Sequence, residues 1–136
     1  MAVRVELARI IISEISDYQV IYLKEIEGDR AFPISIGLFE ATSIKRRIRG
    51  VTTPRPLTHD LLLSVGESLG GCFERVMIRD LDEATFFADL RIKHGEEMLD
   101  IDARPSDAIA IAVSCDPPLP IFVEEKVFTK VGLQSP

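Results

Sequence analysis

Two short segments concentrate the residue types that could do chemistry. The first reads Thr-Pro-Arg-Pro-Leu-Thr-His-Asp over residues 53–60, and the second reads Asp-Ala-Arg-Pro-Ser-Asp over residues 102–107. Each combines arginine, carboxylate and proline at a point where a helix is expected to begin. Because a neutral imidazole can accept or donate a proton near about pH 7, His59 is the candidate general base or acid. Any catalytic or binding site is therefore expected at these two segments.

The first segment places an arginine on a stiff connector. Arg55 lies between Pro54 and Pro56, and each proline fixes its own backbone and biases the preceding residue away from helix. A guanidinium held in this way is suited to two-point contact with a phosphate or a carboxylate. The alternative is a salt bridge from Arg55 to Asp102 or Asp107.

Carboxylates stand at the starts of expected helices. Glu40 and Asp107 each fall in a first turn, where the helix N-terminus stabilises negative charge, and that local role is one interpretation. In the other, the helix starts face a shared cleft. Five side chains would then converge there to hold a divalent cation or to activate water: Glu40, His59, Asp60, Asp102 and Asp107.

Apolar periodicity predicts the elements that position these side chains. A helix should run from Leu38, with apolar residues at three- and four-residue spacing, until Gly50 stops it. Thr58 is the expected N-cap of a second helix, which ends at residues 70–71. Three strands, rich in β-branched and apolar residues, are expected before these helices: 3–15, 18–26 and 31–36.

A third helix is expected directly after the second charged segment. Pro105 suits the first helical position, and residues 108–112 are apolar enough for a buried helix. Burial so close to Asp102 and Arg104 should force both charges to pair or to line a pocket. Residues 116–118 then break the chain before a final short strand over 119–123.

The second half of the chain repeats the first at an offset of 67 residues. The offset relates turn glycines, strand residues and helix starts, for example Leu23 to Leu90, Gly28 to Gly95, Ile34 to Ile101, Glu40 to Asp107, and Ile44 to Ile111. This pattern predicts an internal duplication of a β-β-β-α unit. The expected fold is a single α+β domain over residues 1–136 with a mixed or mostly antiparallel sheet. Its core should span about 3–127, followed by a short tail over 128–136.

Length and composition limit the class of protein. With 136 residues, 46% of them hydrophobic, the chain can bury one compact core, and a homo-oligomer, with a dimer favoured, is expected. No apolar run is long enough to span a bilayer and the N-terminus lacks a signal-peptide pattern, so a soluble, cytoplasmic protein without a membrane partner is expected. Cys72 and Cys115 lie far apart in apolar contexts and are expected to be buried free thiols. His94, beside Gly95, should be an exposed turn residue.

Charge is unevenly distributed along the chain. The net charge of −6 argues against a protein that coats nucleic acid non-specifically, because phosphate neutralisation needs a basic surface. Between Ala41 and His59, however, there is no acidic residue, and five of the sixteen basic residues fall there: Lys45, Arg46, Arg47, Arg49 and Arg55. The first four are either the solvated end of a helix, where cations suit the dipole, or a local cationic patch.

Three segments together resemble the bifunctional nuclease (BFN) domain family. They are Ile-Ser-Ile-Gly-Leu-Phe-Glu-Ala over 34–41, Arg-Pro-Leu-Thr-His-Asp over 55–60, and Ile-Asp-Ala-Arg-Pro-Ser-Asp-Ala-Ile over 101–109. The resemblance covers residues from about Val3 to Val127. It implies an α+β domain that cleaves DNA and RNA, in a family whose bacterial and plant members are mostly uncharacterised.

The resemblance also assigns roles to the candidate residues. Phosphodiester hydrolysis needs an activated water and stabilisation of charge on the phosphate oxygens. His59 would be the general base or acid, Arg55 and Arg104 would clamp phosphate, and the basic residues from Lys45 to Arg49 would steer the polyanion. The expected ligands for Mg²⁺ or Mn²⁺ are Glu40, Asp102 and Asp107, with Asp60 as a further carboxylate at the catalytic site.

Two other functions remain open from the sequence. In a non-enzymatic oligomeric binding or regulatory module, the arginines and carboxylates would be interface salt bridges. In a binding domain for a small anionic metabolite, Arg55 and Arg104 would hold the ligand at helix N-termini.

Overall fold

The computed structural model describes residues 1–136 apart from 14, 16, 18 and 135–136. The described residues form seven strands and four helices, in the chain order β1 (Ala2–Ile11), β2 (Gln19–Glu25), β3 (Ala31–Ile36), α1 (Leu38–Ile48), α2 (Thr58–Ser68), β4 (Gly71–Asp82), β5 (Thr85–His94), β6 (Glu97–Ala103), α3 (Pro105–Ser114), β7 (Ile121–Glu124) and α4 (Glu125–Gln134).

All seven strands belong to one mostly antiparallel sheet. Their order is β3-β2-β1-β7-β4-β5-β6, and the parallel pair is β4 with β7. Strands that follow one another in the chain account for most neighbours, since β1 pairs with β2, β2 with β3, β4 with β5, and β5 with β6. The two-residue loop between β4 and β5 places Glu83 and Ala84 at positive φ, as hairpin loops of this length require. The α+β class and the mostly antiparallel sheet predicted from the sequence are confirmed.

The two halves of the sheet share one element order. β1, β2, β3 and α1 are followed by α2, and then β4, β5, β6 and α3 repeat the pattern. Leu38 opens α1 and Pro105 opens α3, which keeps the predicted offset of 67. That this shared order arose by an internal duplication stays a prediction.

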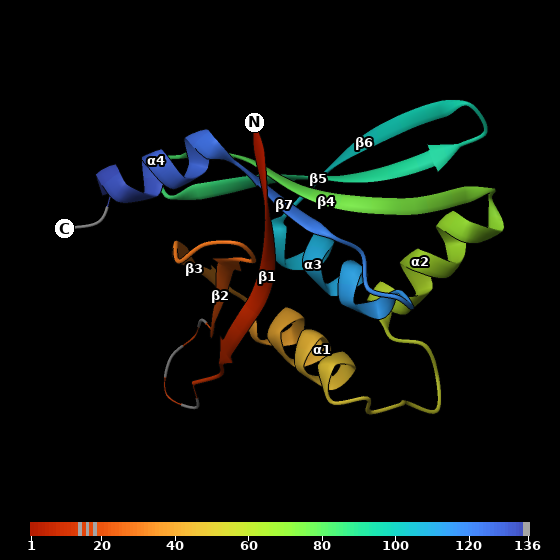
Figure 1. Ribbon diagram of the computed structural model, residues 1–136. Helices are drawn as coiled ribbons and strands as arrows, with labels where there is room; N and C mark the ends of the chain where they lie inside the picture. Colours follow the sequence, from red (N-terminus) through yellow and green to blue (C-terminus); the bar gives the residue numbers. More distant parts are fainter. Residues whose placement is uncertain (14, 16, 18, 135–136) are drawn as a thin grey trace.

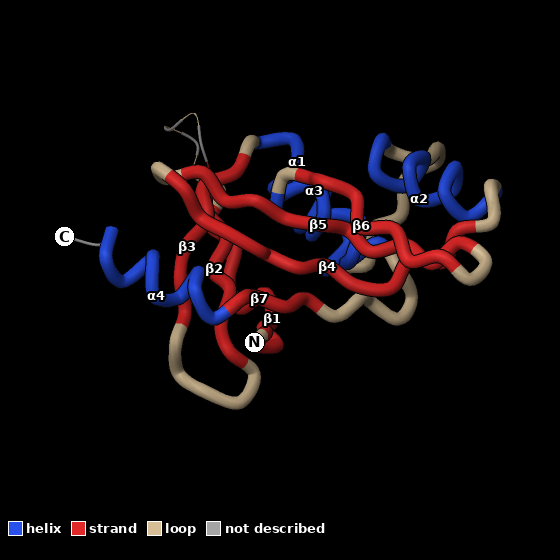
Figure 2. Tube along the Cα trace, turned by 90° about the horizontal axis from the view of Figure 1, so that it is seen from above, coloured by secondary structure: helices blue, strands red, loops and turns tan. Residues whose placement is uncertain are grey.

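α3 is the central helix of the fold. Eight of its ten residues are buried, because its Ala- and Ile-rich sequence offers apolar side chains on every face. It contacts α1, α2, β4 and β5. In Figure 1, β1 runs nearly vertically and β4, β5 and β6 nearly horizontally, so the sheet bends around α3. Figure 2 shows β4, β5 and β6 lying over α3 when seen from above. This packing fixes the start of α3 between α1 and α2.

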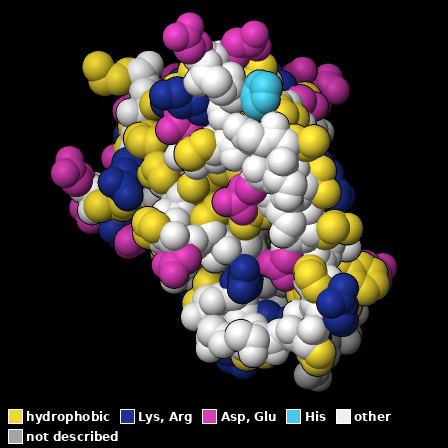
Figure 3. All heavy atoms as spheres, turned by 90° about the vertical axis from the view of Figure 1, so that its right-hand side faces the viewer, with side chains coloured by type: hydrophobic (Ala, Val, Ile, Leu, Met, Phe, Trp, Pro, Cys, Tyr) yellow, Lys and Arg dark blue, Asp and Glu magenta, His cyan; other side chains and the backbone are white. Residues whose placement is uncertain are grey.

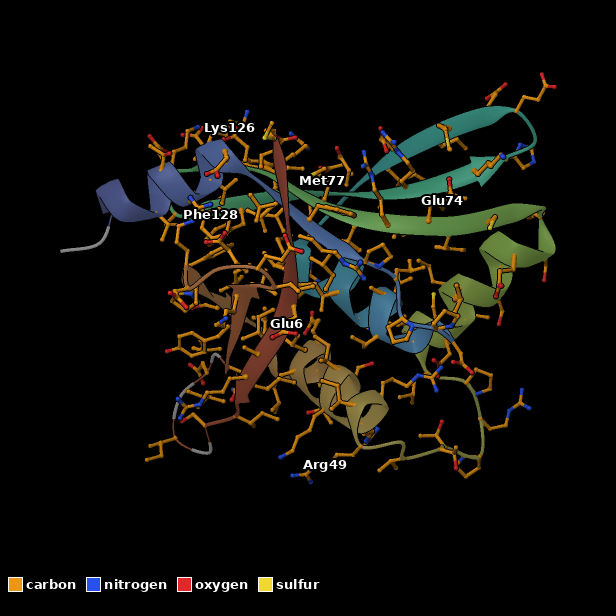
Figure 4. All side chains as sticks on the ribbon, in the orientation of Figure 1. Glu6, Arg49, Glu74, Met77, Lys126 and Phe128 are labelled. Carbon is orange, nitrogen blue, oxygen red and sulfur yellow. The ribbon has the colours of Figure 1, made fainter. Side chains whose placement is uncertain are left out.

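The C-terminal segment extends the core. Residues 128–136 were predicted to be a tail, but α4 runs to Gln134 and Phe128 is only 9% exposed. The Phe128 ring meets Phe32 edge-on at 5.3 Å between centroids, and Phe32 stacks on Phe86 at 5.5 Å. Figure 4 shows Phe128 on the inner side of α4.

Several predicted boundaries need correction. β1 ends at Ile11, four residues before the predicted end of the first strand, and the predicted start of the second strand at position 18 lies outside the described residues. Thr58 is the first residue of α2 and not its N-cap, which is Leu57. The Asp60 side chain accepts a hydrogen bond from the Leu57 backbone at 3.1 Å, so the acid in the first turn supplies the cap.

Both cysteines are free, as predicted, but their burial differs from the prediction. Cys72 is exposed and Cys115 is half-buried. Burial raises the pKa of the Cys115 thiol. His94 is exposed, as expected, although it is the last residue of β5. Within the described part of the chain, no helix is long and apolar enough to cross a membrane.

Candidate functional site

Three helices begin at one pocket of about 540 Å³. α1 contributes residues between Leu38 and Arg46, α2 contributes its cap and first two residues, and α3 contributes Arg104 and Asp107. Helix N-termini carry partial positive charge, so their convergence favours an anionic ligand. The volume falls within the range of roughly 300–1,000 Å³ typical of small-ligand sites.

Arg104 is held by two carboxylates in this pocket. Its Nη2 donates to Glu40 Oε1 at 2.9 Å, and its Nε donates to Asp107 Oδ2 at 2.9 Å. The hydrogen bond to Asp107, the charge of Asp107 and the charge of Glu40 all raise the pKa of Arg104. The Arg104 side chain is nevertheless 69% exposed, and Nη1 takes part in none of the contacts formed by the described residues. The two carboxylates thus fix the orientation of the guanidinium through Nε and Nη2, while Nη1 stays accessible to a ligand.

His59 lies on the inner side of this cluster. Its Nε2 is 2.9 Å from Asp107 Oδ1, and its Nδ1 is 3.3 Å from the hydroxyl oxygen of Ser43. In the tautomer that carries its proton on Nε2, the ring donates to the carboxylate while Nδ1 accepts from Ser43. Since both ring nitrogens are engaged, His59 can exchange a proton with a ligand only when one of these bonds opens.

Asp60 and Arg47 serve the local structure beside the pocket. Arg47 Nη2 lies 3.2 Å from Asp60 Oδ1 and donates to the Ser114 carbonyl oxygen at 3.0 Å. Asp60 also caps α2 through the Leu57 backbone. These contacts join α1, α2 and the end of α3, so the predicted catalytic role of Asp60 competes with a structural one.

The predicted basic patch is divided between different surfaces. Arg46 lines the pocket, whereas Lys45 and Arg49 line a separate hollow of about 230 Å³ against β1. Figure 4 shows Arg49 pointing away from the body of the molecule at the end of α1. Arg55 is exposed on the connector between α1 and α2, where its carbonyl accepts a hydrogen bond from Thr53. Of the five basic residues predicted to bind substrate, Arg46 is therefore the one that lines the pocket.

Asp102 lies away from the pocket. Its carboxylate is 77% exposed and pairs with Arg79 at 2.9 Å, and it stands across from Asp89 in the β5–β6 ladder. Strand alternation turns Asp102 to the opposite face from Ile101, which stands across from the buried Leu90. The carboxylate that reaches the helix starts is therefore Asp107. The salt bridge considered from Arg55 to either of these acids does not form among the described residues, because their partners are Arg79, His59 and Arg104.

The carboxylates do not fit the predicted Mg²⁺ or Mn²⁺ site. Glu40 and Asp107 already share Arg104 as their counter-ion, so a metal ion between them would have to displace a guanidinium. Asp102, the third predicted ligand, faces elsewhere. The described residues contain no group of three or more His, Cys, Asp and Glu side chains with the geometry to hold a metal ion.

Arg104 also borders a second hollow, of about 640 Å³, on its other side. That hollow lies between β3, the β4–β5 loop and the first residues of α3. It contains neither His59 nor Glu40. The chemistry therefore centres on the 540 Å³ pocket, although it is the smaller of the two.

Ser43 and Phe39 are among the pocket residues that the sequence did not single out. Ser43 is buried and positions His59, and Phe39 stands at the pocket with an 87% exposed side chain. Ser43 lies one turn after Glu40 on the buried face of the amphipathic helix α1, and a buried polar side chain there needs a partner. That requirement is the signal that could have identified it.

Comparisons with known proteins agree on one family. The model of the bifunctional nuclease domain matches residues 21–136, which include every pocket residue named above. An uncharacterised protein of Mycobacterium tuberculosis (strain ATCC 25618 / H37Rv) is 44% identical over 117 residues, covering 86% of this chain and 68% of that protein. Bifunctional nuclease 1 of Oryza sativa subsp. japonica is 27% identical over 121 residues, covering 86% of this chain but 36% of the plant protein. Bifunctional nuclease of Oryza minuta matches to the same extent.

Proposed function

Because this chain belongs to the bifunctional nuclease domain family, we propose that it is a nuclease acting on DNA and RNA at the pocket where α1, α2 and α3 begin. The observation that carries the proposal is the cluster of Arg104, Glu40, Asp107 and His59. It combines a phosphate-binding group with an acid–base pair in one pocket.

Arg104 is suited to binding the scissile phosphate. Two carboxylates fix the plane of its guanidinium, so little conformational entropy is lost when a ligand binds. Its exposed Nη1 and the three helix starts favour the negative charge that develops on the phosphate oxygens. Arg46 adds a second cation on the α1 side of the pocket.

The His59–Asp107 pair is suited to moving a proton. Asp107 accepts from Arg104 and from His59 on different oxygens, and Ser43 holds the far side of the imidazole ring. With Arg104 and His59 each occupying one acceptor site of Asp107, the remaining lone pairs of this carboxylate can orient or deprotonate an attacking water. Glu40 keeps Arg104 at the mouth of the pocket.

The test is cleavage of labelled single- and double-stranded DNA and RNA, with Mg²⁺, Mn²⁺ or EDTA. Asp107→Asn and His59→Gln should each lower kcat/KM by about 100-fold or more, the usual contribution of general acid–base catalysis. Asp102→Asn is the matched control, since it makes the same chemical change outside the pocket, and it should stay within about twofold of wild type.

The outcomes distinguish the candidate sites. Loss of cleavage in Asp102→Asn together with full activity in Asp107→Asn would move the site to β6. Cleavage that persists in all folded variants would rule out this pocket, and absence of cleavage with every metal and substrate would rule out the nuclease. The EDTA arm tests the predicted metal requirement separately from the role of the pocket residues.

A second candidate function is the binding of a small anionic metabolite. The size of the pocket and the open face of Arg104 favour it. A thermal shift produced by a phosphorylated metabolite, in a protein that cleaves no nucleic acid, would support this function over the nuclease.

A further inference from the structure

Among the seven phenylalanines, all of which lie in the described part of the chain, Phe39 alone is strongly exposed. Its side chain is 87% accessible, whereas Phe32 and Phe128 are core residues. Phe39 lies in the first turn of α1 and lines the pocket that contains Arg104. A large aromatic side chain left in water at a charged pocket is available for stacking on a flat ligand.

The neighbours of Phe39 on α1 form one line along the pocket. Phe39, Ser43 and Arg46 recur at four- and three-residue spacing, so they share a face of the helix. The line extends for about 10 Å, given the rise of a helix over seven residues. It begins with an aromatic ring and ends with a guanidinium, and Arg104 borders the same pocket from α3.

This combination matches the two parts of a nucleotide. A ring on which a base stacks, beside arginines that contact the flanking phosphates, is the usual arrangement in proteins that bind single strands. The negative charges of Glu40 and Asp107 are balanced in this pocket by two arginines, because Arg104 pairs with both carboxylates and Arg46 adds a second positive charge.

We propose that Phe39 stacks on an unpaired base while Arg46 and Arg104 contact the adjacent phosphates, so that the pocket takes single-stranded nucleic acid. The proposal rests on the proposed nuclease function and adds the form of the substrate. In a duplex both faces of each base are already stacked. Flipping a base out of the duplex costs free energy, and this cost is absent for an unpaired base in a single strand. Paired substrates should therefore bind more weakly than unpaired ones.

The experiment measures binding by fluorescence anisotropy, with gels to confirm that the probes stay intact. The probes are a labelled oligothymidylate, an oligouridylate, an abasic strand of the same length and a duplex. Wild type should bind the two strands with bases about tenfold more tightly than the abasic strand, and Phe39→Ala should remove this difference. Because the chain has no tryptophan, Phe39→Trp adds a single fluorescent reporter. Oligothymidylate should quench the fluorescence of this tryptophan, and the abasic strand should leave it unchanged.

Leu69→Trp is the matched control, because Leu69 is 73% exposed beyond the far end of α2, and its fluorescence should not change. Equal binding of the abasic strand and oligothymidylate by wild type would overturn the stacking proposal while leaving the phosphate site and the nuclease intact. Equal binding of duplex and single strand would also overturn it. Absence of both binding and cleavage would overturn the nuclease and this proposal together. If Phe39→Ala changes the oligomeric mass but not the affinity, the ring belongs to a protein interface and the proposal is wrong.

Discussion

At the scale of single residues, the site depends on how Arg104 is held. Its contacts with Glu40 and Asp107 use the planar geometry of the guanidinium, which offers donors in two directions at once. A lysine ammonium would carry the same charge, but its three rotatable donors sit on one atom and lack the fixed planar spread of the guanidinium that contacts both carboxylates. The shape of the side chain is therefore as important as its charge.

Arg104→Lys should lower kcat/KM for nucleic-acid cleavage by roughly 10- to 100-fold, as expected when a charge-assisted hydrogen bond is lost. Steady-state kinetics would show the loss, and circular dichroism would confirm that the variant is folded. Guanidinium added to Arg104→Ala should restore part of the rate. A Lys variant with wild-type kinetics would show that a point charge is sufficient.

The sequence predicted much of this cluster but not all of it. Glu40, Arg104 and Asp107 could be placed together because helix starts are marked by proline and by first-turn acids. Asp102 was assigned to the site because it lies only two residues before Arg104 in the chain. Successive residues of a strand point to opposite faces, so Asp102 and Ile101 must face opposite sides of the sheet. This alternation could have shown from the sequence that Asp102 points away. The partnership of Ser43 with His59 joins two helices, and no local pattern specifies it.

At the scale of elements, periodicity identified α1, α2 and α3 because each has a clear stop or start signal. α4 was missed because it follows β7 without a connecting loop and contains Gly132 near its end. The contacts that hold α4 in place also come from residues far away in the sequence. Arg30, after β2, contacts Glu125 on α4 and Glu25 on β2, and its guanidinium lies 4.2 Å from the centre of the Phe128 ring.

These ion pairs should make stability depend on pH. Hydrogen bonds from Arg30 lower the pKa of Glu25 and of Glu125 below their ordinary values. A carboxyl group whose pKa is lower in the folded state than in the unfolded state stabilises the fold at pH values above its unfolded-state pKa. This contribution is lost as the pH falls through its folded-state pKa. In urea unfolding between about pH 7 and about pH 3, Arg30→Gln should be less stable than wild type near neutrality, and the gap should narrow in acid.

The matched control is Arg4→Gln, which removes one positive charge from an exposed position for which the described residues supply no ion pair. Its difference from wild type should stay nearly constant with pH. A gap between Arg30→Gln and wild type that is equally constant would show that Arg30 stabilises α4 through the Phe128 ring and not through the two carboxylates.

At the scale of the whole molecule, α2 leaves an apolar surface uncovered. None of its residues is buried, and four large aliphatic side chains recur along the helix and at its C-cap, at helical spacing and with 49–73% exposure: Leu61, Leu62, Val65 and Leu69. Figure 3 looks onto the side of the molecule where α2 lies and shows apolar side chains at the surface there. A contiguous row of exposed apolar side chains on one helix is a candidate protein–protein contact surface.

We therefore expect the predicted homodimer to form through α2. Val65→Glu should shift the mass measured by analytical ultracentrifugation from dimer to monomer, because it places a charge within the apolar stripe. Ser64→Glu, on the exposed polar side of the same helix, should leave the mass unchanged. A wild-type monomer, or a dimer unaffected by Val65→Glu, would show that the α2 stripe is not the interface.

The position of β7 has a consequence for how the chain is made. β7 has four residues, yet it pairs with β1 on one side and β4 on the other and so joins the two halves of the sheet. During synthesis from the N-terminus, more than a hundred residues must leave the ribosome before this strand exists. Until then β1 and β4 are both open edges, which can pair with other chains. Nascent chains stalled before Ile121 should therefore need chaperones far more than chains that include Glu124.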